Sequence, residues 1–304
     1  MPQRILVVGS TPFATRLVHY LQAYGKAKER RVLVVQHTER VASIDDVQRG
    51  VWQTYVGDDD QGRPDLIVNA YETASLMACE TNPSEAWQSN SRVAAMVALA
   101  ARAAEIPLVH MSSEHVFRGD NGPYSIEAAP NPINVYGVTK WYGEITASTI
   151  YPKDGHLGTT VVRHSELYGF DVVTSPPRPF KTTEEQQVMR VHDTASMVPT
   201  FIAEAAFLLA RNILLNPSSL NEPILHISTK ESPTTWWDFL IAADVEVLEN
   251  VNRSATVSEE SVRVGQQRGL SASPGWFLPS RSPDVQWANF TAEARTQRMM
   301  RFWK

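Results

Sequence analysis

The sequence predicts an α/β protein: a doubly wound, Rossmann-type parallel sheet followed by a smaller C-terminal lobe that binds a substrate or a partner. Two observations predict the sheet. Short apolar runs alternate with stretches of helical periodicity through the first half of the chain, and this alternation is typical of βαβ units. The runs have consecutive apolar residues at their centres instead of an alternation of apolar and polar ones, as in strands covered by helices on both faces.

The elements at the start of the chain follow this pattern in order. The run 4–8 is a strand that ends at Gly9, and the stretch 13–24 repeats apolar residues at helical spacing. The apolar run 31–35 is the second strand. The next strand, 65–69, follows a breaker that contains glycine and proline.

The following elements complete the alternation. The stretch 83–104 is rich in alanine and predicts a long helix, because alanine has the highest helix propensity. The run 106–111 returns as a strand, 135–149 as a helix and 159–162 as a strand. We therefore expect residues 1–170 to form a dinucleotide-binding domain.

The rest of the chain, 171–304, has a different character and is expected to form the smaller, mixed lobe. The segment 172–183 is rich in proline and polar residues and predicts a loop. Further elements are expected as helices at 198–212 and 234–243 and a strand at 224–228. The chain is expected to cross back to the sheet around 188–230.

Composition excludes several functions. The chain has 304 residues, 43% of them hydrophobic and 20% charged, with a net charge of −5. No block of Lys and Arg supports nucleic-acid binding, and the longest apolar runs are too short to span a membrane. Cys79 is the only cysteine, so an internal disulfide and a cysteine-based metal cluster are excluded. The N-terminus has no signal-peptide layout, and we expect a cytoplasmic protein.

Tyr136 and Lys140 form the most informative local pattern. Four residues apart on a helix, they share one face, where the ammonium is expected to lower the phenol's pKa from its free value of about 10. The pair Ser112 and Ser113 lies upstream and can hold a carbonyl oxygen beside the phenol. Such a site protonates a carbonyl while a cofactor delivers hydride. Taken alone, the serines are equally explained by a turn or a strand-end cap.

The chain resembles the extended short-chain dehydrogenase/reductases, specifically the dTDP-4-dehydrorhamnose reductase group, which also contains the regulatory β subunit of methionine adenosyltransferase. The resemblance rests on ordered motifs within the first 170 residues and on a fainter match further on. The matching segments are 64–70, 86–90, 108–119, 122–124, 134–140, 143–144 and 163–169, then 198–200 and 225–228.

The resemblance implies a role for each matching residue. Ser113 would polarise the substrate carbonyl, Tyr136 would be the general acid, and Lys140 would tune Tyr136 and hold the nicotinamide ribose. Substrate would meet Glu114, His115 and Ser165. His115 stands where the family has a tyrosine, which leaves recognition of a nucleotide sugar the weakest part of the comparison.

The cofactor loop departs from the family. The expected Gly-x-x-Gly-x-x-Gly keeps only Gly9, with Pro12 and Thr15 at the other two positions; this alters the dinucleotide site or removes it. Tyr71 and Glu72 replace small residues and would crowd the channel or add negative charge. The candidate cofactor-binding residues are Gly9, Thr11, Pro12, Phe13, Arg40, Asn69, Ala70, Tyr71, Asn90, Ser112 and Lys140.

The choice of dinucleotide depends on the residues after the second strand. No acidic residue stands at the strand end to bind a ribose 2′-hydroxyl, and Arg40 follows nearby. This favours NADP over NAD, although Arg40 is equally compatible with a solvated loop. His110 and His115 invite comparison with a metal site, but no second set of ligands accompanies them, so no metal is expected.

Function is left between two classes. The first is an NAD(P)H-dependent reductase acting on a small-molecule carbonyl, such as a 4-keto sugar nucleotide. The second is a non-catalytic regulatory subunit that binds a partner enzyme, or else a sensor of NADP. The tail 298–304, with Phe302 and Trp303, could anchor a partner or fold back on its own lobe. A homo-oligomer is compatible with either class.

Overall fold

A computed structural model describes most of the first 168 residues and parts of the remainder. The described residues are 3–27, 32–43, 45–46, 63–73, 75–168, 189–192, 196–229, 233–235, 238, 251–254, 268, 270–274 and 276–278. The expected loop 172–183 and the tail 298–304 lie outside them.

The core of the molecule is a seven-stranded sheet in the order β13-β10-β5-β4-β3-β1-β2. Its strands are β1 (Gln3–Val8), β2 (Val32–His37), β3 (Leu66–Asn69), β4 (Leu108–Ser113), β5 (Thr159–His164), β10 (Ile224–Thr229) and β13 (Phe277–Leu278). All neighbouring strands are parallel, so the predicted fold class is confirmed. The strand order reverses between β1 and β3, the position at which open α/β sheets bind ligands.

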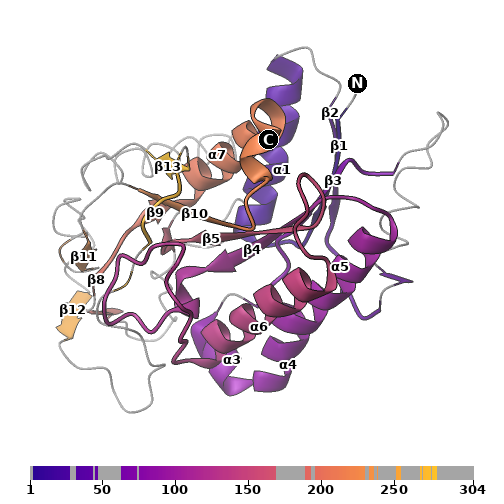
Figure 1. Cartoon of the computed structure of the whole chain (residues 1–304). Helices are drawn as coiled ribbons and strands as arrows, with labels where there is room; N and C mark the ends of the chain where they lie inside the picture. Colours follow the sequence, from indigo (N-terminus) through magenta and orange to yellow (C-terminus); the bar gives the residue numbers. More distant parts are fainter. Residues whose placement is uncertain are drawn as a thin grey trace, which may run out of the picture.

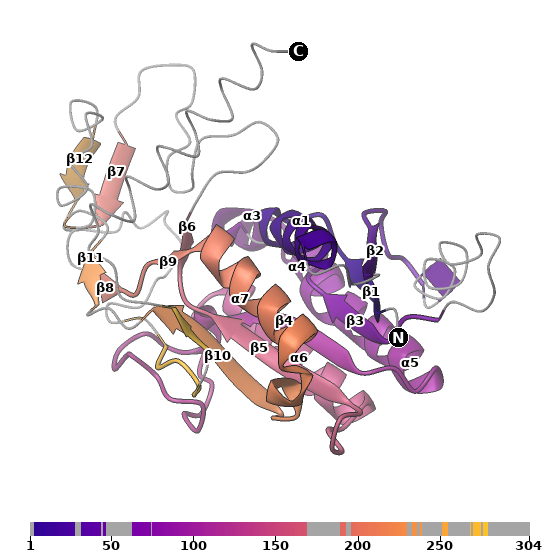
Figure 2. The same cartoon turned by 90° about the horizontal axis from the view of Figure 1, so that it is seen from above.

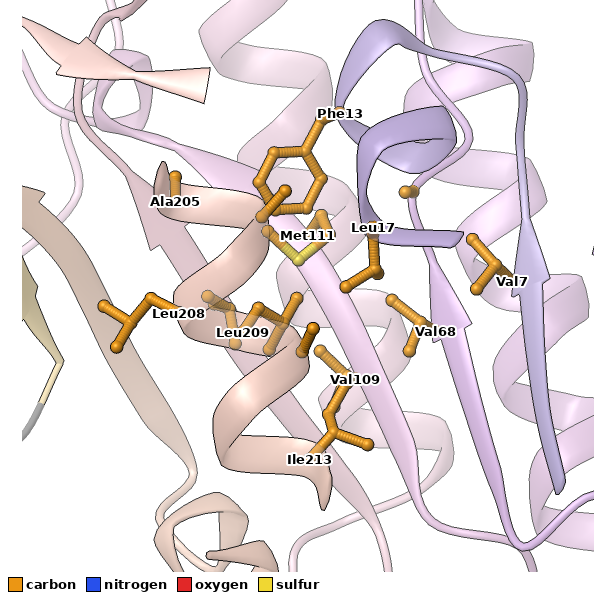
Figure 3. Packing of buried hydrophobic residues seen from close by; sticks show 14 of the residues in the cluster. Val7, Phe13, Leu17, Val68, Val109, Met111, Ala205, Leu208, Leu209 and Ile213 are labelled. Atoms are coloured by element: carbon orange, nitrogen blue, oxygen red, sulfur yellow. The ribbon is translucent and has the colours of Figure 1, made fainter. Parts of the chain in front are cut away.

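Helices cover both faces of the sheet (Figure 1). One face carries α1 (Pro12–Ala27) and α7 (Ile202–Leu215), which pack against each other. The other carries α5 (Val93–Ala103) and α6 (Val135–Ile150). Apolar side chains from the sheet, α1 and α7 form the larger core, shown in Figure 3, including Val7, Leu17, Val68, Val109, Leu209 and Ile213.

The prediction of one continuous helix at 83–104 is wrong, because the helix is interrupted by a π-helical turn. The chain forms α4 (Pro83–Trp87), a π-helical turn η1 (Gln88–Arg92) and then α5. Within the wide turn, the side chain of Asn90 bonds outside the helix, to the hydroxyl of Thr139 at 3.0 Å. Such turns are frequent at functional sites, and periodicity over a long window does not register one extra residue.

Two expected elements of the later chain also begin differently. The helix predicted from residue 198 begins at Ile202, because β9 (Thr200–Phe201) pairs with β6 (Leu167–Tyr168). The helix predicted from residue 234 is wrong at its start, where β11 (Thr234–Thr235) pairs with β8 (Ser196–Met197). Except for residue 238, the rest of that segment lies outside the described residues. Pairs of two residues are too short to leave a periodicity.

Short strand pairs stand apart from the main sheet. A further pair joins β7 (Met189–His192) to β12 (Val251–Ser254), and Figure 2 shows β7, β8, β11 and β12 grouped to one side of the main sheet. From the same half of the chain, α7 and β10 join the main layers. The domain boundary at residue 170 stays a prediction. Within the described part, no helix is long and apolar enough to cross a membrane, and the cytoplasmic location stays a prediction.

Candidate active site at the carboxyl edge of the sheet

The predicted catalytic residues meet where β1, β3, β4 and β5 end. Parallel register places Val8 of β1 beside Asn69 of β3, and Ser113 of β4 beside His164 of β5. Because parallel strands end at the same edge, their last residues lie together near the switch point, where open α/β sheets bind ligands. Helix α6 begins at this edge and brings Tyr136 and Lys140 to it.

Asn134 fixes the start of α6. Its side-chain oxygen accepts a hydrogen bond of 2.7 Å from the Gly137 N–H, as an N-cap does. Gly137 lies so close to η2 (Glu114–Val116) that an added Cβ would overlap the His115 backbone oxygen. The close approach sets Tyr136 beside Ser113, whose hydroxyl lies near enough to the phenol to lower its pKa in part.

Lys140 is buried, and its ammonium is already engaged. Nζ donates a hydrogen bond of 2.6 Å to the Met111 backbone oxygen and lies 3.0 Å from Glu72 Oε2. The same carboxylate oxygen accepts a hydrogen bond of 3.1 Å from the Tyr136 hydroxyl. The structure therefore brings together Ser113, Tyr136 and Lys140 as predicted, but with a carboxylate between the last two.

The expected lowering of the phenol's pKa is wrong. Burial, followed by the charge of Glu72, raises the pKa of Tyr136 well above 10, and the nearby Ser113 hydroxyl offsets this only in part. The phenolate would lie beside a carboxylate that already neutralises Lys140, so the ammonium has little effect on the phenol. Tyr136 is a protonated hydroxyl at neutral pH and a weak acid.

The start of α1 offers few donors to a phosphate. Pro12 has no N–H, and the Ala14 N–H donates to the Thr11 hydroxyl at 3.2 Å, so two of the first three helical positions are unavailable. Phe13 lies between them and stacks on His164. The helix dipole still favours an anion at this end of α1, but the phosphates of a dinucleotide would meet a reduced set of N–H groups.

Gly9 has a structural reason of its own. Its φ is +118°, and an added Cβ would lie 2.6 Å from the Ala70 backbone oxygen. The glycine thus allows the ends of β1 and β3 to approach each other, whether or not a phosphate binds. Thr11 supports the same contact through a hydrogen bond of 3.4 Å to the Ala70 oxygen.

At the end of β2 the side chain of Gln36 is already engaged. Gln36 turns back and donates to the Gly9 backbone oxygen at 2.9 Å. Arg40 lies beyond it, exposed and outside any helix or strand. The preference for NADP stays a prediction.

Asn69 and Asn90 fix the loop that follows β3. Asn69 bonds to His110 Nδ1 at 3.1 Å and accepts from the Tyr71 N–H at 3.2 Å. Asn90 accepts from the Thr73 N–H at 2.8 Å. Both predicted cofactor residues thus act within the described structure as supports for the loop carrying Glu72.

The predicted substrate residues Glu114 and His115 belong to a buried charged cluster. Arg268 Nη1 lies 3.3 Å from Glu114 Oε1 and 3.4 Å from His115 Nε2, and it also pairs with Glu166. Although the two glutamates and the histidine are close enough to share a metal ion, the guanidinium supplies the positive charge there. Through its edge-to-face ring contact with Tyr136, at 5.5 Å, His115 connects the cluster to the predicted catalytic residues.

Ser112 and Ser165 are both buried. Within the described part, the Ser112 hydroxyl has no hydrogen-bond partner. Ser165 bonds to the Ser228 hydroxyl at 2.9 Å and accepts from the Leu270 N–H at 3.1 Å. Its hydroxyl therefore holds distant segments of the chain together, and its role toward substrate stays a prediction.

Arg268 and Glu166 were not identified from the sequence. Glu166 lies inside one of the matching motifs, where its charge was a usable signal. Arg268 is 102 residues further along in a segment without a motif. Only the fold brings the two together.

Stability should depend on pH through Glu114. Burial, opposed by Arg268 and increased by Glu166, raises the pKa of Glu114 from 4.5 to about 8. Between pH 4.5 and about pH 8, the folded chain keeps a proton on Glu114 that the unfolded chain releases. The free energy of unfolding should therefore fall as pH rises through this range, by at most about 1.4 kcal/mol per pH unit. Urea unfolding across this range measures the slope, and Glu114→Gln should reduce it.

Glu166 does not cancel this effect. Arg268 and His115 outweigh its burial and lower its pKa, so its contribution to stability is lost only at more acidic pH. The exposed Glu85 on α4 provides the control, since Glu85→Gln should leave the slope unchanged. An unchanged slope in Glu114→Gln would assign the pH dependence to another group.

Comparisons with known proteins show the family and the fold of the chain. The family model for the RmlD substrate binding domain matches residues 3–269. A dTDP-4-keto-6-deoxy-D-glucose reductase from Streptomyces niveus is 30% identical over 180 residues, covering 59% of this chain and 59% of that protein. Methionine adenosyltransferase 2 subunit beta from Bos taurus is 36% identical over 107 residues, covering 35% of this chain and 30% of that protein.

A solved structure extends the comparison along the whole fold. The dTDP-4-dehydrorhamnose reductase from Bacillus anthracis, solved in complex with NADP, superposes with a TM-score of 0.73 at 20% identity, covering 96% of this chain and 99% of that one. In sequence, the chain matches less than two thirds of the length of either curated relative.

Proposed function

This chain belongs to the RmlD substrate binding domain family, as its motifs predict, and on that premise we propose that it is an NAD(P)H-dependent carbonyl reductase. The observation that carries the proposal is the convergence of Ser113, Tyr136 and Lys140 at the switch point of the sheet. No other part of the described chain combines a proton donor, a polarising hydroxyl and a buried ammonium in one crevice.

The proposed roles follow from the contacts. A nicotinamide dinucleotide, when bound, supplies the hydride. The Tyr136 hydroxyl donates the proton to the carbonyl oxygen of the substrate, and the Ser113 hydroxyl donates a hydrogen bond to that same oxygen. Lys140 holds the nicotinamide ribose through its ammonium.

The proposed substrate is a 4-keto sugar nucleotide or a similar carbonyl compound, since both reductases compared above act on keto sugars of this kind by name. Glu114 and His115 would face it from η2. The raised pKa of Glu114 makes this side chain a neutral hydrogen-bond donor at neutral pH, which suits a sugar hydroxyl or a phosphate better than a carboxylate would.

Dinucleotide binding is the first test. Because a ligand that binds only the native state stabilises it by mass action, NADP at about 100 times its Kd should raise the melting temperature by about 5 °C, and NAD by less. Thermal melts of the full chain with each dinucleotide at millimolar concentration measure this. No shift with either would remove the reductase and also the proposal of an NADP sensor.

Turnover is tested separately. The chain is incubated with NADPH and dTDP-4-dehydrorhamnose, and the nicotinamide absorbance is followed. A fall in absorbance supports both the reaction and the substrate class. Binding of NADPH without any fall at saturating protein would contradict this substrate.

A second candidate is a non-catalytic regulatory subunit. The occupied ammonium of Lys140 and the reduced phosphate site favour it, as does the similarity to methionine adenosyltransferase 2 subunit beta. The proposed partner is then an enzyme. Purification from native extract distinguishes the candidates, because a stoichiometric partner is expected for a regulatory subunit and its absence would count against one.

A further inference from the structure

The Glu72 carboxylate contacts both the ammonium and the phenol that the proposed reduction needs. Its Oε2 atom lies 3.0 Å from Lys140 Nζ and 3.1 Å from the Tyr136 hydroxyl oxygen. Lys140 Nζ also donates a hydrogen bond of 2.6 Å to the Met111 backbone oxygen. Since an ammonium has only three N–H donors, a bound ribose would find at most one of them unused.

The position of Glu72 is held by its neighbours on both sides. Before it, the Tyr71 N–H donates to the Asn69 side chain at 3.2 Å. After it, Thr73 donates its N–H to Asn90 Oδ1 at 2.8 Å and accepts from Asn90 Nδ2 at 3.4 Å. The loop is therefore anchored to the end of β3 and to η1, and this anchoring holds the carboxylate against Lys140 and Tyr136.

The charges explain why the contact persists. The Lys140 side chain is 1% exposed and that of Glu72 12%. Burial alone would raise the pKa of Glu72, but Lys140, with smaller contributions from His164 and Tyr136, holds it below 4.5. Glu72 is thus ionised at neutral pH and neutralises a buried ammonium that would otherwise have no counter-charge in this contact.

The same contact opposes both directions of the proposed chemistry. Proton donation by Tyr136 leaves a phenolate next to the Glu72 carboxylate, and like charges this close repel. In the oxidative direction the phenolate would have to form first and meets the same repulsion. Glu72 therefore stabilises the resting cleft and disfavours the state in which the reaction occurs.

We propose that Glu72 is a built-in blocking group, whose carboxylate occupies the Lys140 ammonium and the Tyr136 hydroxyl until the nicotinamide ribose and the substrate carbonyl displace it. This inference rests on the proposed function, because it takes Lys140 as the ribose ligand. It deepens that function because the nicotinamide ribose and the Glu72 carboxylate then compete for the same Lys140 ammonium. A side chain at position 72 without charge should convert the chain into a tighter dinucleotide binder.

The test compares NADP binding by the full chain and by Glu72→Gln, using isothermal titration calorimetry. The amide keeps the shape and one hydrogen-bond acceptor but loses the charge. Hydrogen bonds to charged groups contribute enough that their loss should lower the Kd for NADP by about 10- to 100-fold. Glu85→Gln is the matched control, and its Kd should equal that of the wild type.

A second variant and a second measurement keep the proposal testable if Glu72→Gln does not fold. Glu72→Asp retains the charge but withdraws it by one methylene, so it should lower the Kd by less than Glu72→Gln does. If Glu72→Gln does not fold, Glu72→Asp carries the comparison. Ultraviolet titration, with Tyr136→Phe as the reference, should show that Tyr136 ionises at lower pH in Glu72→Gln. An ion pair that only supports the fold would not change NADP affinity.

The outcomes separate the two proposals. Tighter NADP binding by Glu72→Gln supports the blocking role. Equal and measurable binding by the wild type and Glu72→Gln overturns the blocking role and leaves the reductase in place. Absence of binding by every variant overturns the cofactor assignment, and the blocking role with it.

Discussion

Replacing Tyr136 with Phe should lower kcat for carbonyl reduction by about 10²- to 10⁴-fold, the contribution typical of a positioned general acid. The substitution removes only the hydroxyl that donates to Glu72 at 3.1 Å. The ring stays in its cluster with Cys79 and Ala86, so the fold should be retained. Steady-state kinetics with NADPH measure the loss, and circular dichroism checks the fold.

The matched control lies on the same helix. Tyr142 is 45% exposed and packs edge-to-face on Trp87, away from the catalytic cluster, so Tyr142→Phe should leave kcat unchanged. If Tyr136→Phe retained full activity, the proton would have to come from another group. Glu114, whose pKa is raised to about 8, would then be the next donor to test.

The strands of the sheet were predictable because burial on both faces leaves a direct trace in the sequence. A strand such as β3 is buried along its whole length and is apolar at consecutive positions, here Leu66 to Val68. The π turn at Asn90 leaves no comparable trace, since it changes the helix by a single residue. Strand pairs of two residues, such as β8 with β11, are likewise fixed by tertiary contacts rather than by local pattern.

The candidate site likewise contains residues whose arrangement could be predicted from the sequence and one whose contacts could not. Tyr136 and Lys140 were predictable because their spacing on one helix sets their relative position. Glu72 was recognised as an added charge near the channel, but its contact with Lys140 joins residues 68 positions apart and depends on how the loop after β3 is anchored. The pKa of Tyr136 is raised first by burial and then by the charge of Glu72. Neither cause can be seen from the helix alone, which is why the expectation of a lowered pKa failed.

Changing Gly137 to Ala should destabilise the chain and displace the helix that carries Tyr136. An added Cβ at this position would overlap the backbone oxygen of His115 and lie 3.0 Å from Pro132 Cβ. Backbone does not yield as a flexible side chain does, so α6 would have to move away from η2. We expect a loss of about 1–3 kcal/mol in the free energy of unfolding, measured by urea titration.

The same movement should reduce catalysis beyond the loss of stability. Tyr136 precedes Gly137, and a displacement of about 1 Å between Tyr136 and Ser113 can cost about 10²-fold in rate. Gly155→Ala is the control, because Gly155 has a φ of +55° but no atom within 4 Å of an added Cβ. It should cost only the backbone strain of about 1–2 kcal/mol and leave kcat unchanged. Unchanged turnover in folded Gly137→Ala would mean that the proton donor does not depend on the docking of α6 against η2, and would contradict the assignment of Tyr136.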